Sequence, residues 1–300
     1  MNTKIKYIIP VLLLLSVSIV SAGILDWLDF TGRATTGTHN ISITLGNSAP
    51  AIEGVSTISA QSISEDGSSP VTFNFQASDA DGVTNLNDTT AIASFQKGGE
   101  VTRTTSCSLI EDIDGTTANY TCTIGIWYFD GAGSWTINVT ITDVNDASTE
   151  DLGSSFTLGE TTAMTFAPNA LSFSGATSAA TTDTLADQNA LINNTGNDEI
   201  ISGGLTVTAI NLVGETDDSK IIYGGNFTVH TAAACSVGTT MANGTAIGVT
   251  GATLPKGNHS LNDGSTGQEQ LFYCLEAMNT DLTEQDYTTS TGGPWSISIS

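Results

Sequence analysis

Basic residues are scarce in this chain, and their scarcity limits what it can bind. Of 300 residues, only 7 are Lys or Arg, against 31 Asp or Glu, which gives a formal net charge of −24. Proteins that bind nucleic acid neutralise phosphates with clustered Lys and Arg, whereas the basic residues here are scattered along the sequence. We therefore exclude nucleic acid as a partner.

Charged residues of any kind are also few. They make up 13% of the chain, compared with about a quarter of an average soluble protein. Their place is taken by 47 Thr, 31 Ser and 31 Gly. Thr is β-branched and favours strands, while Gly marks turns. This composition predicts an all-β protein.

Motifs of common enzymes are missing as well. The three histidines, His39, His230 and His259, lie far apart in the sequence, and neither H-E-x-x-H nor G-x-S-x-G occurs. Carboxylates close in sequence stand in turn-like contexts, so no glycosidase pair can be selected from them. We predict a non-catalytic protein without catalytic or cofactor-binding residues. A secreted hydrolase is one alternative.

The N-terminus, residues 1–22, is predicted to be a signal peptide. Lys4 and Lys6 precede an apolar run that ends in Val20-Ser21-Ala22, which is the usual order of basic, apolar and small-residue regions. Cleavage after Ala22 would leave a mature chain that begins at Gly23. The alternative is an uncleaved anchor helix, since the apolar run can extend to about 19 residues. The chain would then touch the membrane only through this segment.

Export also explains the cysteine content. An even number of cysteines in an exported protein predicts disulfides, and four cysteines allow three connectivities. Proximity within the predicted domains favours Cys107–Cys122 and Cys235–Cys274. A zinc site is excluded because no C-x-x-C or Cys/His spacing occurs.

A linker, residues 23–46, precedes the first predicted domain and is expected to be polar and extended from Thr31 onward. Strict alternation of apolar and polar residues begins after it and predicts strands. Two alternating sets are Val71, Phe73, Phe75 and Ala77, and Trp135, Ile137, Val139 and Ile141. Residues 97–100 are expected to form a turn between two strands. About seven strands in this length predict an antiparallel, immunoglobulin-like β-sandwich over residues 47–159; a closed barrel is the alternative.

A second β-sandwich is predicted in tandem over residues 160–300. Its expected strands are Met164–Phe166, Leu171–Phe173, Leu205–Ala209, Asn226–Val229, Leu271–Leu275 and Trp295–Ile299. Residues 236–268 are rich in Gly, Asn and Thr without clear periodicity, so we expect a long loop there. The strand at Trp295–Ile299 is expected to lie at a sheet edge.

The first domain resembles cadherin-like or PKD-type extracellular modules of the immunoglobulin-like group. The resemblance covers residues 47–146 and rests on Asn47-Ser48-Ala49-Pro50, Glu65-Asp66-Gly67, Ala77-Ser78-Asp79-Ala80-Asp81-Gly82 and Val139-Thr140-Ile141-Thr142-Asp143-Val144-Asn145-Asp146. The layout is similar to modules in surface proteins of uncultivated archaea. In the second domain, Leu191–Asn197 resembles a strand-turn of surface sandwich domains.

This resemblance implies a calcium site. The matching positions are Glu65, Asp79, Asp81, Asp143, Asn145 and Asp146. Ca²⁺ takes six to eight oxygen ligands, and clustered carboxylates suit it. The alternative is that these residues form turns in which each side chain bonds its own backbone.

Two further features concern glycans. N-x-[ST] sequons, which are glycosylation candidates in an exported protein, occur at Asn40, Asn87, Asn119, Asn138, Asn193, Asn226, Asn243 and Asn258. The run Trp127-Tyr128-Phe129 could stack on a sugar, although such residues more often pin a sandwich core, as Trp135 is expected to do.

Together these features predict a secreted, extracellular protein of the cell surface or envelope. We expect a structural or adhesive role, as a rigid module of a surface layer or filament. Its expected partners are other surface proteins or further copies of itself. The principal alternative is a carbohydrate-binding module whose partners are surface glycans.

Overall fold

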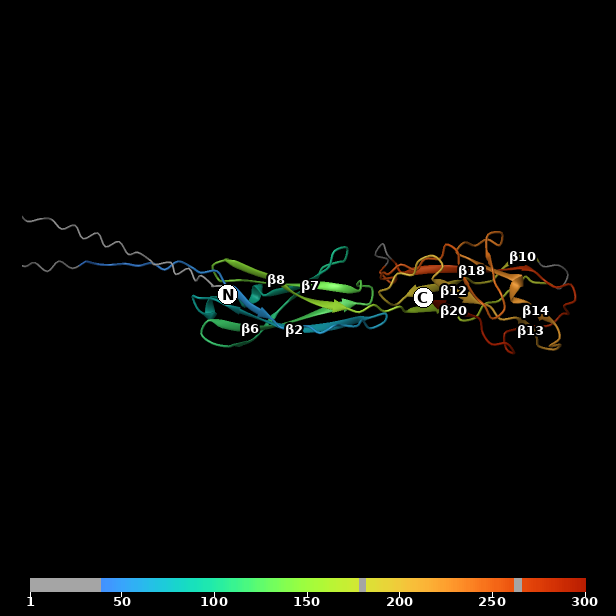
Figure 1. Cartoon of the computed structure of the whole chain (residues 1–300), viewed down its shortest axis with the longest axis horizontal. Helices are drawn as coiled ribbons and strands as arrows, with labels where there is room; N and C mark the ends of the chain where they lie inside the picture. The colour runs from blue at the N-terminus through green and yellow to red at the C-terminus, as the bar shows by residue number, and fades with distance from the viewer. Residues whose placement is uncertain (1–38, 178–181, 262–265) are drawn as a thin grey trace, which may run out of the picture. The chain divides into compact units, whose positions relative to one another are not determined.

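The computed structural model describes residues 39–177, 182–261 and 266–300 (Figure 1). Within these ranges there is no α-helix, only three short 3-10 turns: η1 (Val83–Asn85), η2 (Asp88–Thr90) and η3 (Gly224–Asn226). The predicted all-β class is therefore confirmed. The predicted signal peptide and residues 23–38 of the predicted linker lie outside the described residues. None of the described residues belongs to a helix long and apolar enough to cross a membrane.

Residues 46–300 form one compact unit, whose first eight strands make two antiparallel sheets. The sheets have the strand orders β1-β2-β6-β5 and β4-β3-β7-β8. The strands are β1 (Ala51–Val55), β2 (Ser68–Ser78), β3 (Ile92–Gln96), β4 (Arg103–Ser106), β5 (Ser108–Asp112), β6 (Thr117–Trp127), β7 (Gly133–Thr142) and β8 (Ser148–Leu158). Strand β2 pairs with β6 along all of its 11 residues. The turn expected at residues 97–100 connects β3 to β4.

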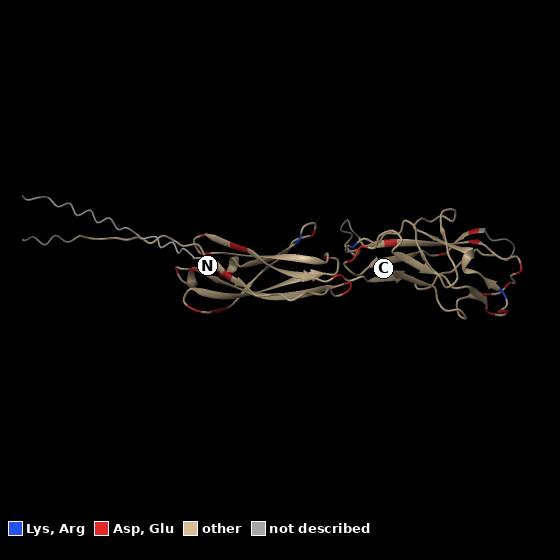
Figure 2. Cartoon of the chain, viewed as in Figure 1, with Lys and Arg blue, Asp and Glu red and all other residues tan. Residues whose placement is uncertain are grey.

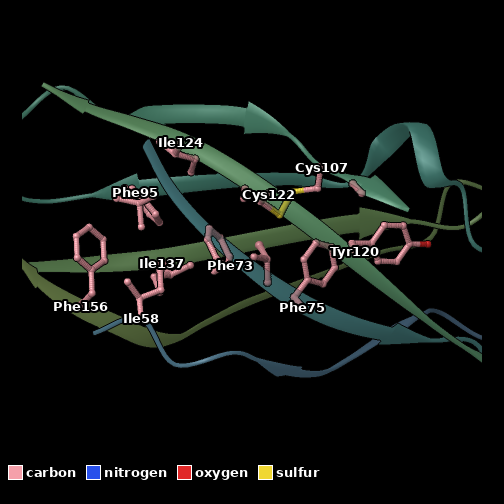
Figure 3. Close-up of a cluster of buried hydrophobic side chains, with 14 of the residues drawn as sticks. Ile58, Phe73, Phe75, Phe95, Cys107, Tyr120, Cys122, Ile124, Ile137 and Phe156 are labelled. Carbon is pink, nitrogen blue, oxygen red and sulfur yellow. A yellow bond between two sulfur atoms is a disulfide. The ribbon is translucent and has the colours of Figure 1, made fainter. Parts of the chain in front are cut away.

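The two sheets bury their inner faces in one apolar cluster, the first core, which extends from Ile58 to Leu158 (Figure 3). Both alternating sets expected from the sequence are buried there, on β2 and β7. The rings of Phe75 and Tyr120 stack with centroids 5.0 Å apart. Burying one such aromatic side chain contributes roughly 1.5–3 kcal/mol, so the alternation alone explains why these strands face one another.

The remaining strands are mostly shorter and form three sheets around a second apolar cluster. We call this cluster the second core; its buried residues extend from Ala190 to Leu282. One sheet has the order β16-β15-β18-β11-β9, with β10 also paired to β18; the others are β17-β12-β20 and β14-β13-β19. The strands are β9 (Met164–Ala167), β10 (Thr182–Leu185), β11 (Ala190–Asn194), β12 (Leu205–Thr208), β13 (Leu212–Gly214), β14 (Ile221–Ile222), β15 (Phe227–His230), β16 (Thr239–Thr240), β17 (Ala246–Gly248), β18 (Gln268–Ala277), β19 (Tyr287–Thr288) and β20 (Ser296–Ile299).

Five of the six strands expected around the second core are present. The expectation for Leu171–Phe173 is wrong, although Leu171 and Phe173 both pack against the second core. Asp187 explains the difference, because its carboxylate accepts hydrogen bonds from the Ser172 and Ser174 hydroxyls at 2.6 and 2.8 Å. Such side-chain bonds compete with a strand ladder. The segment is therefore an irregular loop with two apolar anchors.

Both favoured disulfides are present. Cys107, between β4 and β5, bonds Cys122 of β6, with Cα atoms 4.4 Å apart. Cys235, in the loop after β15, bonds Cys274 of β18, with Cα atoms 5.3 Å apart. Each core therefore has its own covalent cross-link.

Candidate functional site

Acidic and amide side chains gather at one end of the first core, where β2 and β7 end. Asn47 Nδ2 donates to Asp143 Oδ2 at 2.7 Å. Asn85 Nδ2 donates to Asp79 Oδ2 at 3.1 Å and to Asn47 Oδ1 at 3.2 Å. Asp79 and Asp143 are almost fully buried, at 1% and 0% exposure. The group, which we call the acidic cap, ties the incoming chain to two strand ends.

The carboxylates of the acidic cap also bond their own turns. Asp79 Oδ1 accepts from the Asp81 N–H at 2.8 Å, and Asp143 Oδ1 accepts from the Asn145 and Ala147 N–H groups at 2.8 and 2.9 Å. These are the side-chain-to-backbone bonds of turn-forming Asp residues. The hydrogen bond from Asn47, helped by these two backbone donors, lowers the pKa of the Asp143 carboxyl below its usual value.

Of the six residues predicted to bind calcium, Asp79, Asp81 and Asp143 come together at the acidic cap, whereas Glu65 does not. Glu65 precedes β2 and Asp79 follows it, so an 11-residue strand of roughly 35 Å separates them. Asp81 accepts a hydrogen bond from the Ser48 N–H at 2.7 Å, and Asn145 and Asp146 are exposed on the β7–β8 turn. Glu65 lies at the other end of β2, so it cannot join the others. For the remaining residues, the N–H donors that their oxygens face favour the turn-forming alternative, and calcium binding stays a prediction.

Among the described residues, one group of three potential metal ligands lies close together: Asp183, Cys235 and Cys274. Its two sulfurs are joined in a disulfide, so they cannot act as thiolate ligands. This group therefore stabilises the fold and does not bind a metal.

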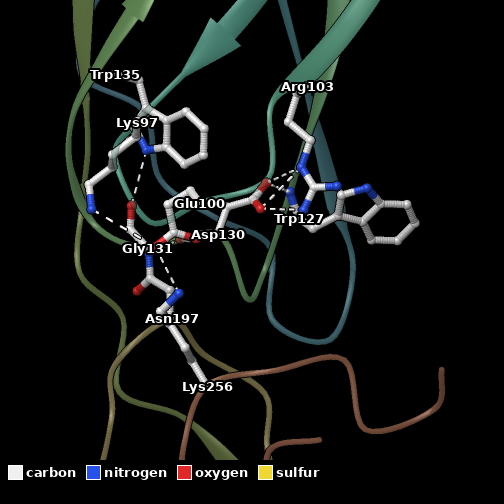
Figure 4. Close-up of polar contacts among 9 residues, drawn as sticks. All are labelled: Lys97, Glu100, Arg103, Trp127, Asp130, Gly131, Trp135, Asn197 and Lys256. Atoms are coloured by element: carbon white, nitrogen blue, oxygen red, sulfur yellow. Dashed lines mark hydrogen bonds and ion pairs between the residues drawn. The ribbon is translucent and has the colours of Figure 1, made fainter. Parts of the chain in front are cut away.

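A buried ion pair occupies the opposite end of the first core (Figure 4). Arg103 Nε donates to both carboxylate oxygens of Asp130 at 3.1 Å, and Asp130 is 1% exposed. The Trp127 N–H donates to the same carboxylate at 2.8 Å. A bidentate guanidinium is the strongest partner a buried carboxylate can have, so this pair holds the β6–β7 turn in one conformation.

The polar contacts between the two cores, which we call the junction, meet at this turn. The residues are Glu100, Tyr128 and Asp130 on one side and Asn197, Lys256 and His259 on the other. Asn197 is 4% exposed; its Nδ2 donates to the carbonyls of Gly159 and Asp130 at 2.9 and 3.1 Å. Its Oδ1 accepts from the Thr161 N–H at 2.7 Å. One amide therefore bonds three backbone groups at the junction, two of them on the side of the first core.

The turn that carries Asn197 depends on glycine. A Cβ atom on Gly196 would lie 2.1 Å from the Thr161 carbonyl oxygen, so only glycine allows the two backbones to approach. In the same turn, the Thr195 carbonyl accepts from the Asp66 N–H at 3.1 Å. The sequence relates this Asn-Thr-Gly-Asn segment only to a strand-turn of surface domains and does not predict the role of Asn197. The asparagines on either side of the glycine, which are typical of a turn, are the feature that indicates it.

Ion pairs and a tyrosine–histidine contact complete the junction. Lys256 Nζ lies 2.8 Å from Glu100 Oε1, and Lys97 Nζ lies 3.9 Å from the same oxygen. The Tyr128 hydroxyl lies 3.1 Å from His259 Nδ1. All four basic side chains that the structure describes are in ion pairs, and three of them are here (Figure 2). The few described basic side chains are thus all taken up in ion pairs within the chain.

The Trp127–Phe129 run is divided between two environments. Tyr128 is 3% exposed and Trp135 is fully buried, whereas Trp127 is 40% exposed. Trp127 stacks on Phe129 with ring centroids 5.9 Å apart, and the Arg103 guanidinium lies 5.4 Å from the Phe129 ring centre. One face of this stack is open to solvent.

A shallow surface hollow of 430 Å³ lies beside the β3–β4 turn. Its lining is Gln96, Lys97, Gly98, Thr102, Ser134 and Thr136. Ligand pockets of this size are mostly apolar, with a few placed polar groups, and this lining has no apolar side chain. Lys97 is its one charged residue, so the hollow does not combine an acid with a base.

The sequons differ in accessibility. Asn40 and Asn243 are exposed, and Asn87, Asn119, Asn138, Asn193 and Asn226 are partly buried. Asn258 is 4% exposed, and its Oδ1 accepts from the Ser260 hydroxyl at 2.8 Å. Asn258 is thus the least accessible of the eight candidates.

Comparison with known proteins identifies no family. No protein-family model and no curated protein matches the chain. Among solved structures, the secreted serine protease VesC from Vibrio cholerae is similar over 82% of this chain and 50% of its own, with 7% identity and a TM-score of 0.21. A chaperone–tip adhesin complex of CFA/I fimbriae is similar over 84% of this chain and 80% of its own, with 11% identity and a TM-score of 0.28. At these TM-scores neither likeness carries an argument.

Proposed function

We propose that this protein is an exported, non-catalytic structural or adhesive component of the cell surface or envelope. In this proposal the two cores belong to tandem immunoglobulin-like β-sandwich domains, residues 47–159 and 160–300, that act together as a rigid module. The module would build part of a surface layer or filament.

The junction is the observation that carries the proposal. Flexible tandem domains are usually joined by exposed linkers with few crossing contacts. Here Asn197 bonds the Asp130 carbonyl at 3.1 Å, and Lys256 pairs with Glu100 at 2.8 Å. Both contacts are shielded from solvent, and each core has its own disulfide. Such contacts and cross-links suit a protein that must keep its structure outside the cell.

The test combines location with activity. Antibodies against the folded chain should label the surface of intact native cells in an even layer or along filaments. A broad hydrolase screen of the purified protein should give no turnover. Turnover that disappears on changing one carboxylate, without loss of stability, would overturn the proposal.

A carbohydrate-binding module is the second candidate, and the solvent-exposed Trp127–Phe129 stack favours it. Aromatic faces bind the apolar faces of sugars, and Trp127 is 40% exposed. A glycan array decides between the two. Binding lost in Trp127→Ala but kept in Tyr223→Ala, which removes another exposed aromatic (51% exposed), would establish this function.

A further inference from the structure

Just before the acidic cap, the chain has an apolar segment without a hydrogen-bonded partner among the described residues. Ile41, Ile43 and Leu45 alternate with polar residues and are 84%, 81% and 87% exposed. No hydrogen bond is found for this segment among the described residues, and none of it is charged. We expected a merely polar linker here. Three aliphatic side chains on one face of an extended segment are instead typical of a strand whose sheet is missing.

Most sheet edges around the first core are protected against such a strand. β1, β5 and β8 each contain or face a bulge in their pairing, and they carry Glu53, Glu111 and Glu150. The remaining edge, β4, carries Arg103. Charges and bulges on edge strands prevent unwanted strand addition.

Around the second core, β20 is an edge without such protection. β16 and β17 have two and three residues, and β9 ends directly before Pro168, which has no N–H. β20 has four residues without charge, pairs with β12 in unbroken register, and is an edge in the described sheet. Ile297 and Ile299 face the second core but remain partly exposed.

The backbone of β20 offers hydrogen bonds on its open side. The Ser300 N–H donates to Gly204 at 3.0 Å, so antiparallel alternation directs Ser298 and Ser296 toward β12 as well. The N–H and C=O groups of Ile297 and Ile299 then point away from β12. An incoming strand can pair with them and cover the two isoleucines.

The segment cannot reach β20 of its own chain. Asn47 is bonded to Asp143 in the acidic cap, whereas β20 packs in the second core, beyond the junction at the other end of β2. The intervening strand is roughly 35 Å long, and the six-residue interval from Ile41 to Asn47 spans at most about 22 Å. A β20 that pairs with this segment must therefore belong to another molecule.

We propose that Ile41–Leu45 of one copy adds as a strand to β20 of a second copy. The inference rests on the proposed structural function and specifies how copies join. Hydrogen bonds between the two main chains would provide affinity. The alternating aliphatic side chains would fix the register of the added strand against β20. Donor and acceptor are different surfaces of the chain, so the contact is heterologous. Repeated contacts of this type build an open filament when successive copies do not close into a ring.

A pair of matched variants of the exported chain tests the donor strand. Ile41→Asp with Ile43→Asp places two charges on the aliphatic face, whereas Ser42→Asp with Thr44→Asp places the same charge on the opposite face. Light scattering over a concentration series should show association at least tenfold weaker in the first variant and nearly unchanged in the second. Equal behaviour of the two variants would overturn the proposal, because simple charge repulsion affects both alike.

A peptide experiment locates the acceptor without changing β20. A synthetic peptide of residues 39–46 is added to the Ile41→Asp, Ile43→Asp copy, whose acceptor edge is intact. Binding should slow amide exchange at Ile297 and Ile299, and the same peptide N-methylated at Ile43 should not bind. Protection of another edge, or no binding, would overturn the inference. The surface location and the absence of turnover are measured separately, so the proposed function can stand or fail alone.

Discussion

The strands around the first core are long and regular, whereas those around the second core are short and connected by loops. β2, β6 and β8 each have 11 residues, but β14, β16 and β19 have two. In the first region, ladders therefore satisfy most of the backbone. In the second, side chains take over part of that role: Gln285 Oε1 accepts from the Thr216 and Asp217 N–H groups at 2.8 Å. The first region depends on its core, and the second depends more on individual contacts.

The two regions also differ in their ion pairs, which gives the largest expected effect. Arg103→Ala leaves the buried Asp130 carboxylate without its counter-ion, and breaking such a pair costs about 3–5 kcal/mol. In the second region, Lys220 pairs with Asp281, whose side chain is 69% exposed. Such surface pairs contribute about 0–1 kcal/mol. Urea denaturation should therefore show a large loss for Arg103→Ala and little for Lys220→Ala.

A double variant controls this comparison. Arg103→Ala combined with Asp130→Asn removes the unpaired charge and should recover part of the stability. A loss in Arg103→Ala no larger than in Lys220→Ala would show that the first region does not depend on the pair.

The disulfides are next in expected effect. On the chain-entropy estimate, Cys235–Cys274, separated by 39 residues, contributes about 4 kcal/mol, and Cys107–Cys122, separated by 15, about 3 kcal/mol. Paired Cys→Ser variants should follow this order. Amide exchange should show that losing Cys235–Cys274 opens the loops around β15 and β18, while the long ladders of the first region stay protected. A larger loss from Cys107–Cys122 would reverse the comparison.

The same difference explains how much could be predicted from the sequence. Alternation located β2 and β7 because one face of each is buried and the other is solvated, as with Phe73 and Thr72. It failed at Leu171–Phe173, where the apolar anchors are real but Asp187 holds the backbone in a loop. Glu65 was wrongly grouped with Asp79, because sequence spacing does not reveal that the two residues lie at opposite ends of β2. Asn197 was missed because its bonding partners are distant backbone carbonyls.

The junction is predicted to couple the two regions. Asn197→Ala leaves the Thr161 N–H and two carbonyls without their partner, at a cost of about 1–3 kcal/mol. Calorimetry should show one transition in the wild type and two in the variant, with the second region melting first. Asn145→Ala, which changes an exposed asparagine on the β7–β8 turn, should leave the single transition intact. A single transition in Asn197→Ala would mean that other contacts couple the cores.

Acid sensitivity compares one carboxylate from each region. Hydrogen bonds lower the pKa of Asp143, chiefly from Asn47, and that of Glu215, chiefly from the Ser290 hydroxyl. A depressed folded-state pKa stabilises the fold above the unfolded value, near 4, and this contribution is lost as the pH falls through the folded value. Asp143→Asn and Glu215→Gln should each flatten the dependence of unfolding free energy on pH below about 4. A curve as steep as that of the wild type would contradict the assigned bonds.

Calcium should have the smallest effect, and it should not distinguish the regions. A specific site would stabilise the first region by roughly 1.4 kcal/mol at ten times its dissociation constant. The Asp81 and Asp143 carboxylates instead accept hydrogen bonds from Ser48 and Asn47 at 2.7 Å, so we expect calcium to act by screening the net charge of −24. Millimolar Ca²⁺ should then shift the melting temperature of the wild type and of Asp81→Asn with Asp143→Asn equally, and Mg²⁺ should act alike. A shift confined to the wild type and to Ca²⁺ would mean that these oxygens turn from their N–H donors to bind the ion.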